Sequence, residues 1–447
     1  MALAQSSDEL TIRKIYDKSL AEGQSYQMLD YLCHKIGARL SGSPGAAAAV
    51  EWSRHVMEDS GFDSVWLQPV MVPHWVRGQK EIGRIINSKK MGTVELSVCA
   101  LGGSVGTGLE GVAANVVEVK NFDELKSLGT QKVKGKIVFF NRPMDPTQIQ
   151  TFSAYGGAVN QRGSGASEAA KYGAVGVIVR SMGVNQEDYP HTGGLRYETG
   201  VPMIPAMAVS TKHADLLSRL VKDDAGLSFY MEMHCQTLDE APSFNVVGQI
   251  RGSEFPDEII AVGGHLDSWD LGQGAHDDGA GCVQSIEVLR IFKVMGYKPK
   301  RTIRAVMFMN EENGLRGGRK YAELARQNKE KHLAAIESDR GGFTPRGFNF
   351  TPDSAHREKI ISTIQGWKRL LEPYGLTEFS TPGGGADIGP LARDRVTVIG
   401  FIPDSQRYFN YHHTPVDTFD KVDKRELELG AASMAALVYL IDQHGLK

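Results

Sequence analysis

The sequence predicts an α/β protein: a doubly wound, mostly parallel sheet flanked by helices, with a second, β-rich module inserted into it. Three observations lead to this expectation. Strand-like runs alternate with helix-like segments over residues 241–447. Short, glycine-bounded strand patterns dominate residues 108–240 instead. At 447 residues, the chain is also too long for one ordinary domain.

The expected elements follow one another along the chain. Residues 8–62 have helical spacing and residues 64–67 a strand pattern, so residues 1–107 are assigned to the N-terminal part of the larger domain. The module at 108–240 has expected strands at 112–119, 136–140 and 174–179, and a helix at 166–172. The last region has expected strands at 258–264, 302–309, 333–337 and 396–402, and helices at 279–292, 317–325 and 426–441.

Composition excludes several functional classes. The formal net charge is -3, from 50 basic and 53 acidic residues, so the basic excess of a nucleic-acid-binding protein is missing. No apolar run approaches the roughly 20 residues that span a bilayer. The four cysteines are isolated in sequence, which favours buried thiols over a disulfide framework or a thiolate zinc site.

The first residues bear on the compartment. The sequence lacks the charged and apolar regions of an intact secretory signal, but Ala2-Leu3-Ala4 before Gln5 is typical of the end of a cleaved one. With Met1 supplied for expression, this pattern predicts a secreted or periplasmic protein after signal removal. A cytoplasmic protein is the alternative.

Imidazole and carboxylate side chains follow the expected strands of the last region. They occur in Gly264-His265-Leu266-Asp267, His276-Asp277-Asp278, Asn310-Glu311-Glu312, Ser338-Asp339 and Tyr411-His412-His413. Parallel sheets bind their ligands at the carboxyl ends of the strands. Imidazole with carboxylate and no thiolate suits zinc or a similar ion that keeps an open coordination position. Each motif alone could be a turn or a polar loop, but their common placement favours a metal site.

Such a set of ligands also predicts the chemistry. Five ligands with one bridging carboxylate can hold two ions, which share a hydroxide and stabilise a tetrahedral intermediate. The reaction needs a base that is not itself a ligand. Adjacent residues at a strand end point in opposite directions, so one of Glu311 and Glu312 can bind metal while the other faces the water.

Several motifs together resemble the co-catalytic two-zinc aminopeptidase family. They are Gly263-Gly264-His265-Leu266-Asp267-Ser268-Trp269, Asp277-Asp278-Gly279, Glu311-Glu312, Glu337-Ser338-Asp339 and His413-Thr414-Pro415-Val416-Asp417-Thr418. Shorter motifs at 37–43, 72–78, 272–274 and 383–390 extend the resemblance to nearly the whole chain from about residue 10.

The resemblance implies two Zn²⁺ ions per chain. Their ligands would be His265, Asp277, Glu312, Asp339 and His413. Asp277 would bridge the ions and would be joined to Asp278 by a cis peptide bond. In the family the ligand histidine stands four residues before an acidic residue and a threonine, which selects His413 over His412.

The resemblance also implies roles for other side chains. Glu311 would act as general base and then as general acid, and Asp267 would orient His265 through its other ring nitrogen. Substrate contacts are expected from Asp387, His412 and Tyr411.

The activity implied is hydrolysis of the N-terminal peptide bond of dipeptides and short peptides by a homodimer. Residues 108–240 resemble a protease-associated domain, which in the family lies beside the cleft. Two alternatives stay open: an N-acyl amino acid amidohydrolase or glutaminyl cyclase on the same scaffold, and a non-catalytic, receptor-like binding protein. The filled ligand positions disfavour the second.

Overall fold

The computed structural model describes residues 6–446, so the Ala2-Leu3-Ala4 pattern lies outside the described residues. The chain divides into two compact units. Unit 1 contains the residues up to Val72, Glu240–Tyr408 and those from Asp417 onward; unit 2 contains Pro73–Asp239 and Phe409–Val416. The β-rich unit therefore starts at Pro73, whereas the sequence predicted a module beginning at residue 108. The long strands β1 (Ser64–Val76) and β10 (Gln236–Ile250) carry the chain from one unit into the other.

An eight-stranded sheet forms the centre of unit 1. Its order is β1-β10-β12-β11-β13-β16-β14-β15, and the remaining strands are β11 (Phe255–His265), β12 (Arg301–Phe308), β13 (Lys331–Glu337), β14 (Pro345–Thr351), β15 (Glu378–Ser380) and β16 (Thr397–Pro403). The four middle strands are parallel, as predicted. At the flanks β10 pairs antiparallel with β12, and β14 pairs antiparallel with β16. Arg346, Gly347 and Asn349 interrupt the apolar pattern of β14, which explains why the sequence did not reveal this strand.

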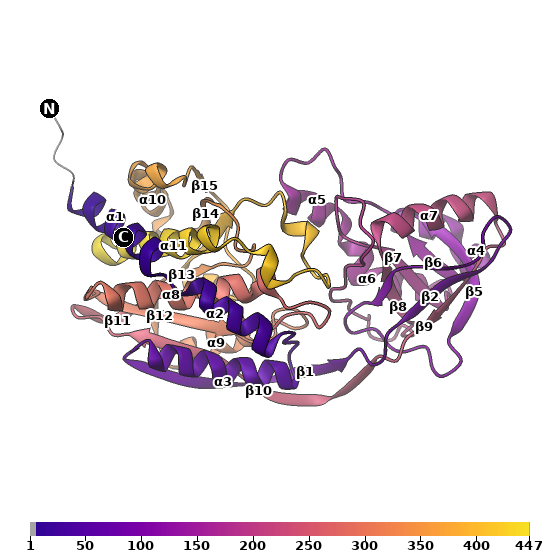
Figure 1. Ribbon diagram of the computed structural model, residues 1–447, viewed down its shortest axis with the longest axis horizontal. Helices are drawn as coiled ribbons and strands as arrows, with labels where there is room; N and C mark the ends of the chain where they lie inside the picture. Colours follow the sequence, from indigo (N-terminus) through magenta and orange to yellow (C-terminus); the bar gives the residue numbers. More distant parts are fainter. Residues whose placement is uncertain (1–5, 447) are drawn as a thin grey trace. The chain divides into compact units, whose positions relative to one another are not determined.

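Helices cover both faces of this sheet. Ile260 and Val262 of β11 pack in the same core as α8 (Ala280–Val294) and α11 (Lys424–His444), whereas Ala261 packs with α9 (Arg316–Gln327). Successive side chains of β11 therefore point to opposite faces of the sheet, and both faces are buried, as expected for a strand covered by helices on both sides. Helices α1 (Ser7–Glu22) and α8 both contact α11, so the three lie together (Figure 1). Unit 1 also contains α2 (Ser25–Tyr31), α3 (Pro44–Asp59) and α10 (Arg357–Leu371).

Unit 2 contains a second eight-stranded sheet with its own helices. The strand order is β3-β2-β9-β5-β6-β7-β8-β4, in which β5 (Val112–Val119), β6 (Ile137–Phe140), β7 (Gly176–Arg180) and β8 (Ala206–Val209) are parallel. The other strands are β2 (Ile82–Ser88), β3 (Gly92–Glu95), β4 (Val98–Ala100) and β9 (Ser228–Glu232). Its helices are α4 (Phe122–Val133), α5 (Thr151–Ala158), α6 (Asn160–Ala170) and α7 (Thr211–Asp223). The whole protein is thus a mixed α/β structure with two sheets.

Two expectations from composition can be compared with the structure. All four cysteines are free and buried, as predicted. Over residues 6–446, no helix is both long and apolar enough to cross a membrane.

Candidate metal centre

Three neighbouring strands of unit 1, β11, β12 and β13, end side by side, and the candidate ligands lie at or just after their ends. His265 is the last residue of β11, where it pairs with Phe308 of β12, and Gly263 pairs with Glu337 of β13. The strands are parallel, so the loops that follow them leave from the same edge of the sheet. These loops carry Glu311 and Glu312 after β12 and Asp339 after β13.

The imidazole of His265 faces two carboxylates. Its Nε2 lies 3.3 Å from Oδ1 of Asp277 and 3.4 Å from Oδ1 of Asp339. Burial alone would lower the pKa of His265, which is only 1% exposed, but the negative charges of Asp339 and Asp277 outweigh burial and raise this pKa well above its usual value. A divalent cation placed among these atoms would compensate the same negative charge.

Within unit 1, the ligand atoms meet in two overlapping groups. His265, Asp277 and Glu312 have ligand atoms within 4.8 Å of one another, and so do His265, Asp278 and Asp339. Four of the five predicted ligands therefore come together in unit 1. This set of one imidazole and several carboxylates, without sulfur, has the donor chemistry that zinc and similar divalent ions accept.

The surrounding carboxyl groups are buried next to one another. Burial raises the pKa values of Asp278 and Glu311 well above their usual range, and the nearby charge of Asp339 raises both further. Burial and the charge of Asp339 likewise raise the pKa of Glu337 to about 7. Buried carboxylates carry a large desolvation cost unless a positive charge compensates them. The residues present thus fit a bound cation.

The carboxylate of Asp267 shapes the loop that carries the two glutamates. Its Oδ1 accepts hydrogen bonds from the backbone N–H groups of Asn310 (2.7 Å) and Glu311 (3.0 Å), and its Oδ2 accepts one from Glu312 (3.3 Å). The sequence predicted that this carboxylate orients His265. In the structure Nδ1 of His265 lies 2.9 Å from the backbone oxygen of Asp267 and 3.9 Å from its carboxylate. Three amide donors leave the carboxylate room for a further contact, so its orienting role stays a prediction.

Two other carboxylates shape the turn that carries Asp277. The Asp277–Asp278 peptide bond is cis, as the resemblance implied. Asp417 accepts hydrogen bonds from the backbone N–H groups of His276 (2.8 Å) and Asp277 (3.1 Å). Asp278 accepts from the N–H groups of His265 (3.1 Å) and Gly281 (3.0 Å). In the sequence, Asp417 served only to select His413 over His412 by its spacing. Its place in the motif at residues 413–418 was the signal that could have indicated this structural role.

His276 belongs to the same turn but has a structural role. Its Nδ1 accepts a hydrogen bond from the N–H of Gly342 (3.2 Å), and its ring stacks on Phe343 at 4.1 Å. Burial lowers the pKa of His276 to about 3, so the ring is neutral. His276 thus stabilises the turn through its contacts with Gly342 and Phe343.

Asp387 has an unusual environment for a carboxylate. It is 1% exposed, and neither of its carboxylate oxygens has a hydrogen-bond partner among residues 6–446. Glu337 holds its loop by accepting hydrogen bonds from the N–H groups of Ala386 (2.8 Å) and Ile388 (2.9 Å). Burial raises the pKa of Asp387 well above its usual value, and Glu337 and Glu311 add to the shift. The oxygens of such a carboxylate can accept hydrogen bonds from a cationic or hydrogen-bond-donating ligand.

Tyr411, His412 and His413 lie on the segment Phe409–Val416, which belongs to unit 2. The two histidine rings stack at 3.6 Å. The backbone oxygen of His413 accepts a hydrogen bond from Thr192 (2.9 Å), and its Nδ1 lies 3.3 Å from the guanidinium of Arg162. The roles of these three residues in metal and substrate binding stay predictions.

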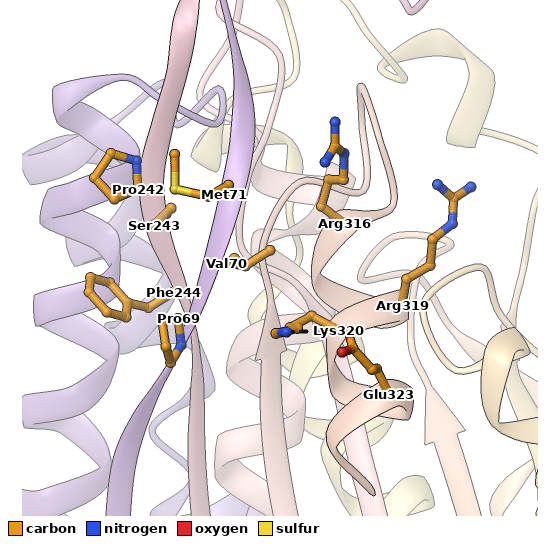
Figure 2. Close-up of a pocket in the computed structure, with 10 residues that line it drawn as sticks. All are labelled: Pro69, Val70, Met71, Pro242, Ser243, Phe244, Arg316, Arg319, Lys320 and Glu323. Carbon is orange, nitrogen blue, oxygen red and sulfur yellow. Dashed lines mark hydrogen bonds and ion pairs between the residues drawn. The ribbon is translucent and has the colours of Figure 1, made fainter. Parts of the chain in front are cut away.

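A separate groove of about 530 Å³ lies on unit 1 between β1, β10 and α9 (Figure 2). Pro69, Val70 and Met71 of β1 form part of its apolar lining. Its basic side chains include Arg316, which pairs with Glu240 at 2.7 Å. None of the residues that line it belongs to the metal centre, so this groove is not the candidate active site.

The comparisons with known proteins agree with this geometry. Residues 245–438, which contain all five predicted ligands, match the model of peptidase family M28. The chain belongs to this family of metallopeptidases.

Individual relatives extend the similarity to nearly the whole chain. Carboxypeptidase Q of Bos taurus is 35% identical over 442 residues, which cover 98% of this chain and 88% of that protein. The crystal structure of a peptidase M28 precursor from Shewanella amazonensis SB2B superposes with a TM-score of 0.91 at 33% identity, over 97% of this chain and 96% of that one. A zinc aminopeptidase from Bacillus subtilis shares the fold, with a TM-score of 0.67 at 19% identity over 93% of this chain and 94% of that one.

Proposed function

We propose that the protein is a zinc-dependent exopeptidase that hydrolyses the N-terminal peptide bond of dipeptides and short peptides. The observation that carries the proposal is the convergence of His265, Asp277, Glu312 and Asp339 at one edge of the sheet, with Glu311 beside them. Membership of a metallopeptidase family supports peptide hydrolysis.

Glu311 would move the proton during the reaction. Bound zinc would polarise the peptide carbonyl and lower the pKa of an attacking water. Glu311 is not a member of either ligand group, and burial raises the pKa of its carboxyl group, which makes the carboxylate a stronger base. It would take the proton from water and return it to the leaving amine nitrogen. Asp267 would keep Glu311 in place through the backbone.

Asp387 would bind the substrate's free amino group. Its two buried oxygens without hydrogen-bond partners suit an ammonium group. An N-acylated substrate has no such cation, so this feature favours an exopeptidase over an N-acyl amino acid amidohydrolase. It does not separate an exopeptidase from a glutaminyl cyclase, whose substrates also have a free amino group. His412 and Tyr411 are proposed as further substrate contacts.

The remaining details follow from the family resemblance. We expect two zinc ions per chain, with His413 as the fifth ligand and Asp277 as the bridge. We also expect a homodimer, an extracytoplasmic location and a protease-associated domain formed largely by residues 108–240. Metal analysis of the purified protein tests the zinc count, and light scattering tests the dimer.

A substrate panel combined with metal removal tests the function. The zinc-loaded protein, and the same protein after chelator treatment, are assayed with dipeptides, N-acetyl amino acids and N-terminal glutaminyl peptides. We expect hydrolysis of peptide bonds, without deacylation of N-acetyl amino acids or cyclisation of glutaminyl peptides, and we expect this activity to be lost with the metal and restored by zinc. Turnover of N-acetyl amino acids, or cyclisation of glutaminyl peptides, would favour the corresponding alternative. Dipeptide hydrolysis that survives complete metal removal would exclude the metallopeptidase.

A further inference from the structure

Residues 37–43, Gly37-Ala38-Arg39-Leu40-Ser41-Gly42-Ser43, have no part in the chemistry described above. They connect the helical turn η1 (Leu32–Ile36) to α3 within unit 1. In sequence they are far from every expected ligand. In the structure, two of their side chains reach the loops that carry those ligands.

Arg39 binds both ends of the loop between His265 and Asp277. Its Nε donates a hydrogen bond to the carbonyl of Leu266 (2.9 Å), just after His265. Its two terminal nitrogens donate to the carbonyls of Gln273 (2.6 Å) and Gly274 (3.0 Å), shortly before Asp277. One planar guanidinium therefore fixes the separation between the start and the end of this loop.

The burial of Arg39 and its hydrogen-bond partners support this role. The side chain is fully buried, and within residues 6–446 its hydrogen bonds go to backbone carbonyls, a fourth being to Gly37 (3.0 Å). The backbone N–H of Arg39 also donates to Oγ of Ser268 (3.1 Å), inside the same loop. A buried guanidinium is costly unless its donors are satisfied, so the position of these carbonyls is strongly determined.

Ser41 makes the corresponding contact with the loop that carries the two glutamates. Its hydroxyl donates a hydrogen bond to Oδ1 of Asn313 (2.9 Å) and accepts one from Nδ2 of Asn310 (2.7 Å). Asn310 and Asn313 flank Glu311 and Glu312 directly. Ser41 is 1% exposed, so water does not compete for these bonds.

We propose that residues 37–43 form a positioning clamp for the metal centre. Arg39 holds the loop that sets the distance between His265 and Asp277, and Ser41 holds the loop that aims Glu311 and Glu312. Both act through other groups and are positioning residues. The inference builds on the proposed metallopeptidase function, but its first test measures metal binding and does not require activity.

Arg39→Lys tests the first half of the clamp. Lysine keeps the charge but cannot bridge three carbonyls with one rigid group. We expect the zinc dissociation constant of the metal-free protein to rise roughly 10- to 100-fold, the usual effect of losing a group that orients ligands. Competition with a chromogenic zinc chelator measures this constant.

Arg304→Lys is the matched control. Arg304 is a buried arginine of β12, in the central sheet of unit 1. Its side chain is hydrogen-bonded to Gln249, Glu330 and Tyr321, none of which lies in a loop that carries a proposed ligand. Thermal unfolding of the metal-free variants compares their stabilities. If both variants lose stability and Arg304→Lys alone keeps the parent zinc affinity, the clamp is supported. Parent zinc affinity in Arg39→Lys would overturn it.

Ser41→Ala tests the second half and carries the test if Arg39→Lys does not fold. We expect the zinc dissociation constant to rise and kcat for a dipeptide to fall, each roughly 10-fold or more, because the loop carries both the ligand Glu312 and the base Glu311. Ser53→Ala is the control, since Ser53 is a buried serine of α3 whose hydroxyl donates a hydrogen bond to the carbonyl of Ala49 in the same helix. An unchanged kcat in Ser41→Ala would exclude this half of the clamp. A parent protein that binds zinc but hydrolyses no peptide would refute the function and leave the zinc measurements on Arg39 valid.

Discussion

At the scale of single residues, the buried carboxylates around the metal centre fall into two kinds. Asp267, Asp278 and Asp417 each accept at least two backbone N–H bonds and thereby fix a loop. Asp387 accepts none within the described part of the chain, although it is equally buried. The first kind holds the site together, and the second kind has oxygens available for a ligand.

Glu311→Gln separates metal binding from proton transfer. The amide keeps the size of the side chain but cannot accept the proton. We expect kcat to fall by roughly 10²- to 10⁴-fold with unchanged zinc content, measured by elemental analysis. Glu312→Gln is the matched neighbour and should lose zinc. A Glu311→Gln enzyme with near-parent kcat would exclude Glu311 as the base.

Asp387→Asn tests recognition of the free amino group. Losing a charge-assisted hydrogen bond costs about 1.5–3 kcal/mol. We therefore expect kcat/KM for dipeptides to fall roughly 10- to 100-fold, mainly through KM, with unchanged zinc content. Asp394→Asn, an exposed carboxylate later in the same region, serves as control. An unchanged KM for dipeptides in Asp387→Asn would rule out this anchor.

At the scale of elements, a buried glutamate joins the C-terminal helix to the start of the chain. Glu428 of α11 accepts hydrogen bonds from the backbone N–H of Tyr26 (3.1 Å) and from Oγ of Ser25 (3.0 Å) in α2. Burial, reinforced by the charge of Glu287, raises the pKa of Glu428 to about 7. The contact between the two helices is therefore sensitive to pH.

The sign of the pH effect follows from proton binding. Between the ordinary pKa of a glutamate, about 4.3, and the folded value near 7, the folded state holds more protons than the unfolded state. The stability from this group is complete below about pH 4 and is lost as pH rises through 7. We expect Glu428→Gln to reduce the fall in the free energy of unfolding between pH 5 and pH 8 by up to about 3 kcal/mol. Urea unfolding at both pH values measures this change.

Glu358→Gln provides the control for this measurement, because Glu358 is an exposed carboxyl on α10. Its substitution should leave the pH dependence of the free energy of unfolding the same as in the parent protein. If Glu428→Gln also leaves it unchanged, ionisation of Glu428 does not contribute to the coupling between these helices.

At the scale of the whole molecule, metal binding should stabilise the fold. The proposed ligands come from separate strand ends of unit 1, so they converge only in the folded state. A ligand that binds only the folded state adds about 2.7 kcal/mol at 100 times its dissociation constant. We expect added zinc to raise the thermal midpoint of the metal-free protein by several degrees, as measured by calorimetry. Stability independent of zinc would contradict a preorganised metal centre.

His265→Ala should abolish this stabilisation, because His265 belongs to both ligand groups. His34→Ala, which removes an exposed histidine from η1, should keep it. A zinc effect that persists in His265→Ala would place the stabilising ion elsewhere.

The sequence by itself determined much of the secondary-structure pattern and the types of ligand side chain that the candidate site contains. The expected strand at 112–119 coincides with β5, and the strands that precede the ligand loops lie close to β11, β12 and β13. Apolar periodicity is local information, so it can be read without coordinates. The candidate motifs could be proposed because imidazole and carboxylate groups recur after consecutive strands, and the family resemblance implied which of them are ligands.

The tertiary structure alone decided which atoms support the site. The carboxylate of Asp267 accepts hydrogen bonds from the backbone amides of the loop that carries the two glutamates, and Arg39 holds a loop more than 220 positions away. The start of unit 2 at Pro73 and the antiparallel flanks of the first sheet also came only from the fold. Hydrogen bonds between distant segments depend on how the chain returns to the same place, and no local pattern of apolar and polar residues records that path.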